Sequence, residues 1–222
     1  MLAARLLPGL GQGDTRGRVD AAVPPWSALV LVQMPGVSRC TGFLIAPRLV
    51  VTAAHCLYAP RVRRLLWPGA VHVLSGFSGG DYAGHSVVAS YQVPTGFVPT
   101  DESGSRGADV AVLALAQPLG GVTLRLAAAQ AGEAAMLGGY NQDRAQVLLA
   151  DPDCRIMGVL ADAARRPLRQ HSCAGTRGTS GAPLLVRDRG QWAAAGVQVA
   201  AVEGGIGGLA VPSETVQALL QQ

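Results

Sequence analysis

The chain has 222 residues, of which 49% are hydrophobic and only 14% charged, so it can bury a substantial core and a disordered protein is excluded. Its formal net charge of +4 comes from 18 basic residues, all arginine, and 14 acidic ones, and gives no indication of a nucleic-acid partner. No apolar run reaches the roughly 18 residues of a transmembrane helix, so we expect no membrane span.

Short runs of aliphatic and β-branched residues recur between turn signals along the chain. Such runs occupy residues 27–34, 39–46, 48–54, 70–74, 85–93, 110–115, 145–150, 154–160, 182–186, 193–202 and 208–212. With 29 glycines and 14 prolines spread between them, they predict an all-β sandwich or barrel. A short helical turn is expected near Ala53. A helix is expected over residues 213–221, because Ser213 can cap its free amides and Glu214 suits its positive end.

Residues 93–109 are rich in turn-forming residues and lie near the middle of the chain. We expect them to join two lobes, roughly residues 19–100 and 110–212. No low-complexity linker divides the chain, so residues 1–222 are interpreted as a single domain in which the two lobes pack together. A monomer is expected.

The four cysteines are Cys40, Cys56, Cys154 and Cys173, with no C-x-x-C pair, so we expect no metal site. The favoured pairing is Cys40 with Cys56 and Cys154 with Cys173, since each bond closes a short loop and contributes roughly 3 kcal/mol. Disulfides indicate an oxidising compartment, and the protein is interpreted as secreted or periplasmic. Residues 1–10 form no clear signal peptide, because an arginine and a proline interrupt their apolar run.

The glycine-rich stretch "CAGTRGTSGAPLL" contains Ser180, a candidate nucleophile. A serine hydroxyl needs an adjacent base and a third group that orients the base. His72 and His85 are interpreted as surface or structural residues, and His171 as ordered only by the neighbouring disulfide. His55 ends the run "FLIAPRLVVTAAHC" next to a cysteine, and the residue on its own does not distinguish a catalytic role from a structural one.

Three motifs together carry a resemblance to a known family. "CTGFLIAPRLVVTAAHC" resembles the histidine motif of chymotrypsin-like serine proteases, "ADVAVLAL" their aspartate motif and "GTSGAPLL" their serine motif. They occur in the family's order, His55, Asp109 and Ser180. That order differs from the orders of α/β-hydrolases and subtilisins. The resemblance implies two six-stranded antiparallel β-barrels followed by a short C-terminal helix.

By this resemblance, Ser180 attacks a peptide carbonyl, His55 takes and returns the proton, and Asp109 orients the imidazole. The backbone amides of Gly178 and Ser180 match the oxyanion-hole positions. Asp101 and Glu102 lie in the preceding loop, but the strand-like run directly after Asp109 favours that residue as the acid. The chemistry needs no cofactor, and the expected partner is a protein or peptide substrate.

The nearest branch resembles bacterial glutamyl endopeptidases. The substrate-binding positions that correspond to the family's pocket are Ala174, Gly175, Arg177, Gln198 and Val199. Ala174 replaces the acid that attracts lysine and arginine, so a trypsin-like preference is not expected. Gln198 stands where glutamyl endopeptidases have a histidine, and Arg177 either favours an acidic substrate residue or points to solvent.

Thr179 occupies the place of an aspartate that, in animal trypsins, binds the amino terminus freed by zymogen cleavage. Arg18 followed by Val19 resembles an activation site, but threonine cannot form that ion pair. We therefore expect Ser180 to be preorganised without such cleavage.

A serine endopeptidase is the favoured function. Two alternatives share the same residues: an inactive binding protein with the protease fold that holds an anionic partner, and an esterase that uses the same triad. An intact set of His55, Asp109, Ser180 and Gly178 favours an active peptidase.

Overall fold

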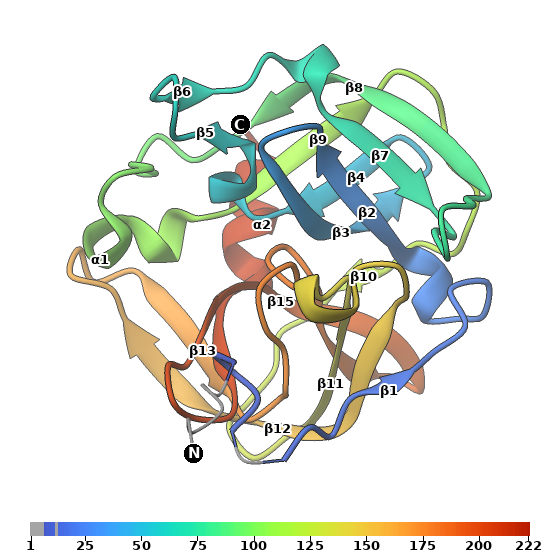
Figure 1. Ribbon diagram of the computed structural model, residues 1–222. Helices are drawn as coiled ribbons and strands as arrows, with labels where there is room; N and C mark the ends of the chain where they lie inside the picture. The colour runs from blue at the N-terminus through green and yellow to red at the C-terminus, as the bar shows by residue number, and fades with distance from the viewer. Residues whose placement is uncertain (1–6, 12) are drawn as a thin grey trace, which may run out of the picture.

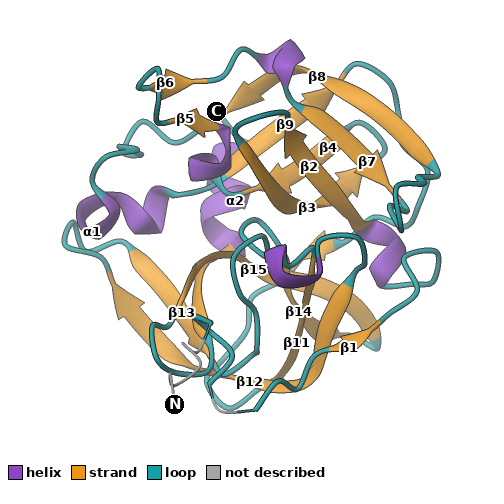
Figure 2. Ribbon diagram, in the orientation of Figure 1, coloured by secondary structure: helices purple, strands orange, loops and turns teal. Residues whose placement is uncertain are grey.

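The computed structural model describes residues 7–11 and 13–222, and strands dominate it (Figures 1 and 2). The strands form two barrels, one built from the first half of the chain and drawn in the upper part of Figure 1, the other built from the second half and drawn below. The expected all-β fold of two barrels with a short C-terminal helix is confirmed.

Six antiparallel strands close the first barrel. In ring order they are β2 (Leu29–Met34), β3 (Ser38–Ala46), β4 (Leu49–Thr52), β9 (Ala111–Leu115), β8 (Gly84–Gln92) and β7 (His72–Ser75). The β2 sequence LVLVQM is buried at five of its six positions, which explains why it reads as a continuous apolar run. Because β9 pairs with both β4 and β8, it closes this barrel, and the expected lobe boundary at residues 100–110 is too early by one strand.

The second barrel also closes through six strands, in the order β12 (Leu149–Ala161), β11 (Ala134–Gly139), β14 (Pro183–Asp188), β15 (Gln191–Ala201), β16 (Gly208–Pro212) and β13 (Pro167–His171). The pairing of β12 with β13 completes the ring. Two short strands extend it: β1 (Gly17–Arg18) pairs with β12, and β10 (Arg125–Leu126) lies parallel to β15.

The expected run 154–160 lies wholly within the long strand β12, whereas of the expected run 145–150 only the last two residues, Leu149 and Ala150, belong to that strand. The strands β11 and β13 were not predicted from the sequence. Their sequences, AAMLGG and PLRQH, contain no β-branched residue, so propensity gives no strand signal.

The helix α2 (Ser213–Leu219) begins where expected and ends two residues before the predicted end. Ser213 is not its cap: Pro212 precedes the first turn, and the Ser213 hydroxyl donates to the Ala194 carbonyl at 2.5 Å. Val216 and Leu219 are buried in a core cluster that contains side chains of both barrels. The helices in the described residues are all too short to cross a membrane.

The remaining short elements lie in the connections. They are the hairpin β5 (Tyr58–Ala59) and β6 (Arg64–Leu65), the helix α1 (Glu102–Ser105), and the 3-10 turns η1 (Trp26–Ala28), η2 (Ala54–Leu57), η3 (Pro68–Ala70), η4 (Arg106–Ala108) and η5 (Gln142–Arg144). The turn η2 is the short helical turn expected near Ala53, and η4 and η5 border the candidate site.

Candidate active site

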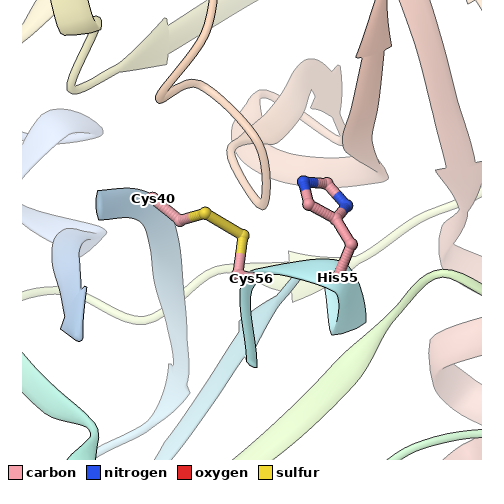
Figure 3. A group of neighbouring side chains, drawn as sticks. All are labelled: Cys40, His55 and Cys56. Atoms are coloured by element: carbon pink, nitrogen blue, oxygen red, sulfur yellow. A yellow bond between two sulfur atoms is a disulfide. The ribbon is translucent and has the colours of Figure 1, made fainter. Parts of the chain in front are cut away.

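His55 lies in the turn η2, directly after strand β4. The next residue, Cys56, forms a disulfide with Cys40 of β3, with an S–S distance of 2.03 Å. Figure 3 shows the imidazole and the disulfide on the same side of this turn. The two sulfurs and an imidazole nitrogen lie within 4.8 Å of one another, but the sulfurs are bonded to each other and offer no thiolate to a metal ion.

The second disulfide joins Cys154 to Cys173, so both expected pairings are present. Replacing Cys40 and Cys56 together by serine is expected to lower the unfolding free energy by about 3 kcal/mol, because the bond closes a loop of 16 residues. The same change frees the turn that carries His55, so turnover of the folded variant is also expected to fall. Thermal melts and peptide turnover test this, and unchanged turnover would contradict it.

Asp109 follows the turn η4 and precedes strand β9, and it is buried. Its Oδ1 accepts the backbone N–H of His55 at 2.8 Å, and its Oδ2 lies 2.6 Å from Nδ1 of the imidazole. Burial lowers the pKa of His55, but the charge of Asp109 and the hydrogen bond to it together raise that pKa above the ordinary histidine value. The pair therefore fixes both the position of the ring and the proton on Nδ1.

The two competing acids have other partners. Asp101 caps α1, where its Oδ1 accepts the Gly104 N–H at 2.8 Å. Glu102 has an exposed carboxylate 3.4 Å from the guanidinium of Arg106. Of the three acids considered from the sequence, Asp109 is the one that contacts His55.

A hairpin of the second barrel holds the loop that leads to Asp109. The Asp162 carboxylate, fully buried between β12 and β13, accepts the Gly107 N–H at 3.0 Å. Arg166 donates to the Gly104 carbonyl at 2.7 Å. Sequence reasoning missed this contact, because the residues are 55 positions apart and no local motif links them.

Ser180 lies in the loop between β13 and β14, and Thr41 of the first barrel donates two hydrogen bonds to carbonyls of this loop. The Thr41 N–H donates to the Ser180 carbonyl and its hydroxyl donates to the Gly178 carbonyl, both at 2.9 Å. Gly178 has φ +95°, and a Cβ at this position would collide with the Tyr140 carbonyl. A glycine is therefore required here.

Along this loop, backbone N–H groups that donate to a carbonyl of the protein alternate with N–H groups that do not. The Thr179 N–H donates to the Thr176 carbonyl at 3.1 Å, and the Gly181 N–H donates to the Gln198 carbonyl at 2.7 Å. Within the described part of the chain, the N–H groups of Gly178 and Ser180 donate to no other residue. Two amides on either side of Thr179 are thus free to bind an external oxygen.

Two cavities meet between the barrels. The histidine-side cavity, of about 320 Å³, is lined by His55, Tyr58, Pro60, Phe97, Val98, Pro99, Glu102, Ser105, Arg106, Asp109, Val199 and Ala200. The serine-side cavity, of about 270 Å³, is lined by Pro8, Glu102, Arg106, Thr176, Arg177, Thr179, Ser180, Gln198, Val199, Ala200, Ala201 and Glu203. Four residues line both, so a single cleft brings His55 and Ser180 to the same region.

Three of the five expected substrate-binding residues, Arg177, Gln198 and Val199, line the serine-side cavity. Ala174 and Gly175 do not line it. The Ala174 N–H donates to the buried Asp151 carboxylate at 2.7 Å, and the Gly175 N–H faces the carbonyl of Gly9 at 3.4 Å. The amino-terminal segment therefore lies where Gly175 was expected to face the substrate.

His171 lies behind the serine-side cavity, and the expectation that only the disulfide orders it is wrong. Its Nε2 lies 2.6 Å from Oε1 of Gln198, and its Nδ1 accepts the Cys173 N–H at 3.2 Å. This network assigns the proton to Nε2. Burial lowers the pKa of His171 to about 4, against the opposing effects of the Gln198 hydrogen bond and the Asp151 charge.

A pH dependence of stability follows from the pKa of His171. The unfolded chain protonates this residue near pH 6.5 and the folded protein only near pH 4, so the unfolding free energy is expected to fall by about 3 kcal/mol over that interval. Above pH 6.5 the residue contributes no slope. Denaturant titrations of His171→Gln should lack this slope, whereas the exposed control His85→Gln should keep it; an equal slope in all three proteins would contradict the assignment.

Two β-barrels with a histidine–aspartate pair and a serine in the cleft between them define a protein of the chymotrypsin fold and of the serine-protease type. A family model described as Trypsin matches residues 15–218, so the chain belongs to the trypsin family. The resemblance to this family is thereby confirmed.

The chain is also similar to glutamyl endopeptidases. It is 29% identical over 112 residues to the glutamyl endopeptidase of Bacillus licheniformis, a match that covers 50% of this chain and 33% of that relative, so the chain spans about a third of the relative's length. A solved Glu endopeptidase in complex with MPD has a TM-score of 0.76 at 24% identity, covering 96% of this chain and 98% of that chain. The Vibrio cholerae VesB protease has a TM-score of 0.70 at 16% identity, covering 93% and 66%.

Proposed function

We propose that the chain is a serine endopeptidase in which Ser180, His55 and Asp109 form the catalytic triad. The observation that carries this proposal is the combination of the His55–Asp109 pair with two unused amides beside Ser180 in the same cleft. A binding protein has no use for an imidazole whose Nδ1 proton is fixed and whose Nε2 is left to accept a proton.

The proposed reaction begins when Oγ of Ser180 attacks the carbonyl carbon of the peptide bond and its proton passes to Nε2 of His55. The carbonyl oxygen takes the negative charge, which the N–H groups of Gly178 and Ser180 stabilise, and removing one such donor typically costs about 100- to 1,000-fold in rate. The C–N bond then breaks as His55 returns the proton to the leaving amine. Water repeats the sequence on the acyl-enzyme, releasing the acid product and restoring Ser180.

This mechanism sets the pH dependence of activity. His55 must be neutral to accept the Ser180 proton, and Asp109 raises the pKa of His55 above its ordinary value of 6.5. We therefore expect kcat/KM for a peptide substrate to rise with pH through a midpoint above 6.5. A midpoint below 6.5, measured from pH 5 to 9 with protein shown to be folded throughout, would contradict the role given to His55.

Neither Gln198 nor its hydrogen-bond partner His171 supplies a positive charge to the serine-side cavity. Gln198 is neutral and buried, and His171 is uncharged at pH 7 because burial lowers its pKa to about 4. Two arginines line this cavity: Arg177 is exposed, so water screens its charge, and Arg106 lies 3.4 Å from the Glu102 carboxylate, which offsets its charge. We therefore expect this chain to cleave after an uncharged residue. That preference differs from the glutamate that the names of its glutamyl-endopeptidase relatives specify.

A peptide library of mixed sequence, analysed by mass spectrometry after incubation with the folded, disulfide-intact protein, tests the proposed function. Wild type should produce new termini and Ser180→Ala should produce none. Cuts concentrated after glutamate, lysine or arginine would contradict the expected preference. Hydrolysis of a p-nitrophenyl ester without any peptide cleavage would indicate an esterase, and no turnover of either substrate would favour a binding protein.

The two disulfides also bear on the cellular location of the protein. Disulfides persist in oxidising compartments, so the location proposed for this chain is outside the cell or in the periplasm.

A further inference from the structure

Arg16 is an arginine in the amino-terminal segment whose side chain is only 1% exposed. A guanidinium has five N–H donors, and here they meet five contacts from three residues. Nε and Nη2 donate to the Asp14 carboxylate at 2.8 and 3.0 Å, and Nη1 and Nη2 donate to the Asp143 carboxylate at 3.0 and 2.7 Å. Nη1 also donates to Oδ1 of Asn141 at 2.6 Å.

The charges of this cluster reinforce one another. Hydrogen bonds from Arg16 lower the pKa values of Asp14 and Asp143 against the opposing effect of burial, so both carboxylates are ionised at neutral pH. Burial lowers the pKa of Arg16, but the hydrogen bonds to Asp14 and Asp143 and the charges of these two carboxylates together raise it above its ordinary value. Arg144 adds a second cation 3.3 Å from Asp14. The cluster therefore fixes the amino-terminal segment to the turn η5 and to Asn141 before it.

Asn141 transmits the position of Arg16 to the loop that precedes Ser180. Its Oδ1 accepts the Arg16 guanidinium and also the backbone N–H of Thr176, at 3.2 Å. The Thr176 carbonyl in turn accepts the N–H and the hydroxyl of Thr179, at 3.1 and 2.6 Å. Hydrogen bonds through Thr176 and Asn141 thus connect Thr179 to Arg16 and fix its position without an ion pair at Thr179.

Gln142 lies between the two residues that Arg16 holds, and its backbone sets the direction of one free amide. Its N–H donates to the Arg177 carbonyl at 2.7 Å. In a trans peptide the carbonyl and the following N–H point in opposite directions. Fixing the Arg177 carbonyl on Gln142 therefore turns the Gly178 N–H away from Gln142, as an oxyanion donor requires.

We propose that Arg16 is a positioning residue for the oxyanion hole: by holding Asn141 and Asp143 on either side of Gln142, it keeps the Gly178 N–H aimed at the reacting carbonyl oxygen. This inference rests on the proposed function and goes beyond it, because it assigns a catalytic consequence to a segment more than 120 residues from the residues it holds.

The test compares Arg16→Met with a matched control, Arg169→Met. Arg169 is equally buried and donates to the Ala195 and Ala129 carbonyls and to the Glu214 carboxylate, and among the described residues its side chain makes no hydrogen bond to the loop before Ser180. With both variants shown to be folded, Arg16→Met is expected to lower kcat for a peptide by about 10- to 100-fold while KM changes by less than about three-fold. Arg169→Met should keep kcat within about three-fold of wild type.

A more conservative variant covers the case in which Arg16→Met does not fold. Asp143→Asn keeps the shape of one partner and removes its charge, so a smaller loss of kcat is expected, again without a rise in KM. A loss of kcat no larger than that of Arg169→Met, or a change confined to KM, would overturn the proposal.

Hydrogen exchange of the backbone amides in residues 173–181 gives a readout that does not depend on turnover. Exchange in this segment should speed up in Arg16→Met and Asp143→Asn but not in Arg169→Met, and unchanged exchange would overturn the positioning role. If wild type cleaves no peptide, the proposed function fails, and the exchange measurement alone decides whether Arg16 orders the loop.

Discussion

Replacing His55 with alanine is expected to lower kcat for peptide cleavage by about 10⁶-fold, because Ser180 then loses the base that accepts its proton. The change should leave the fold intact. Asp109 keeps its hydrogen bond from the backbone N–H of residue 55, which does not depend on the side chain. Steady-state kinetics on a peptide that wild type cleaves, at a pH where wild-type His55 is neutral, measure the loss.

The double variant His55→Ala with Ser180→Ala sharpens this test. Residues that act as one unit are not additive, so the double variant should be no slower than either single variant. Losses that multiply would mean that the two residues act independently, which contradicts a triad.

Replacing Asp109 with asparagine is expected to lower kcat by about 10⁴-fold through the tautomer of His55. The backbone N–H of His55 donates to Oδ1 at 2.8 Å and requires an oxygen there, so the amide nitrogen of asparagine must take the Oδ2 position, 2.6 Å from Nδ1. A donor at that place makes Nδ1 the acceptor and moves the ring proton to Nε2. The base then has no lone pair facing Ser180.

Asp101→Asn is the matched control for this prediction, because Asp101 lies in the same loop and makes one hydrogen bond to a backbone N–H. It should keep kcat close to the wild-type value. An Asp109→Asn variant with wild-type activity, or an equal loss in both variants, would show that Asp109 does not orient the base.

Most strands of this fold could be predicted from the sequence, because runs such as LVLVQM bury nearly every side chain and need no partner to be recognised. The strand β11 escaped prediction for a tertiary reason. A Cβ on Gly138 would lie 2.6 Å from the Trp26 ring, and one on Gly139 would lie 2.9 Å from the Thr41 hydroxyl. Close contact with the first barrel therefore selects glycines that intrinsic strand propensity disfavours.

The strand β13 also escaped prediction for a tertiary reason, which in this case concerns a buried polar residue. Its Arg169 is buried, and the guanidinium donates to backbone carbonyls and to Glu214 of the helix α2. From the sequence, an arginine within a short polar run indicates a surface loop, because the acceptors that allow its burial come near it only in the folded structure.

The three proposed triad residues were recognised because each lies in its own local motif, and the order of the motifs is diagnostic. The supporting residues have no such motif. The contacts of Arg16 with Asn141 and of His171 with Gln198 join residues that are 125 and 27 positions apart, and they arise only when the second barrel closes. The same holds for Asp162, which reaches the loop before Asp109 from another hairpin.

Covalent labelling with a fluorophosphonate probe, followed by mass spectrometry of the digested protein, tests the central claim most directly. The probe reacts only with a serine whose hydroxyl is activated and whose developing oxyanion is bound. Folded, disulfide-intact wild type is expected to gain one probe mass on the peptide that contains Ser180, and Ser180→Ala is expected to gain none. Folded wild type without the added mass, or with the mass on another residue, would contradict the assignment of Ser180 as the nucleophile.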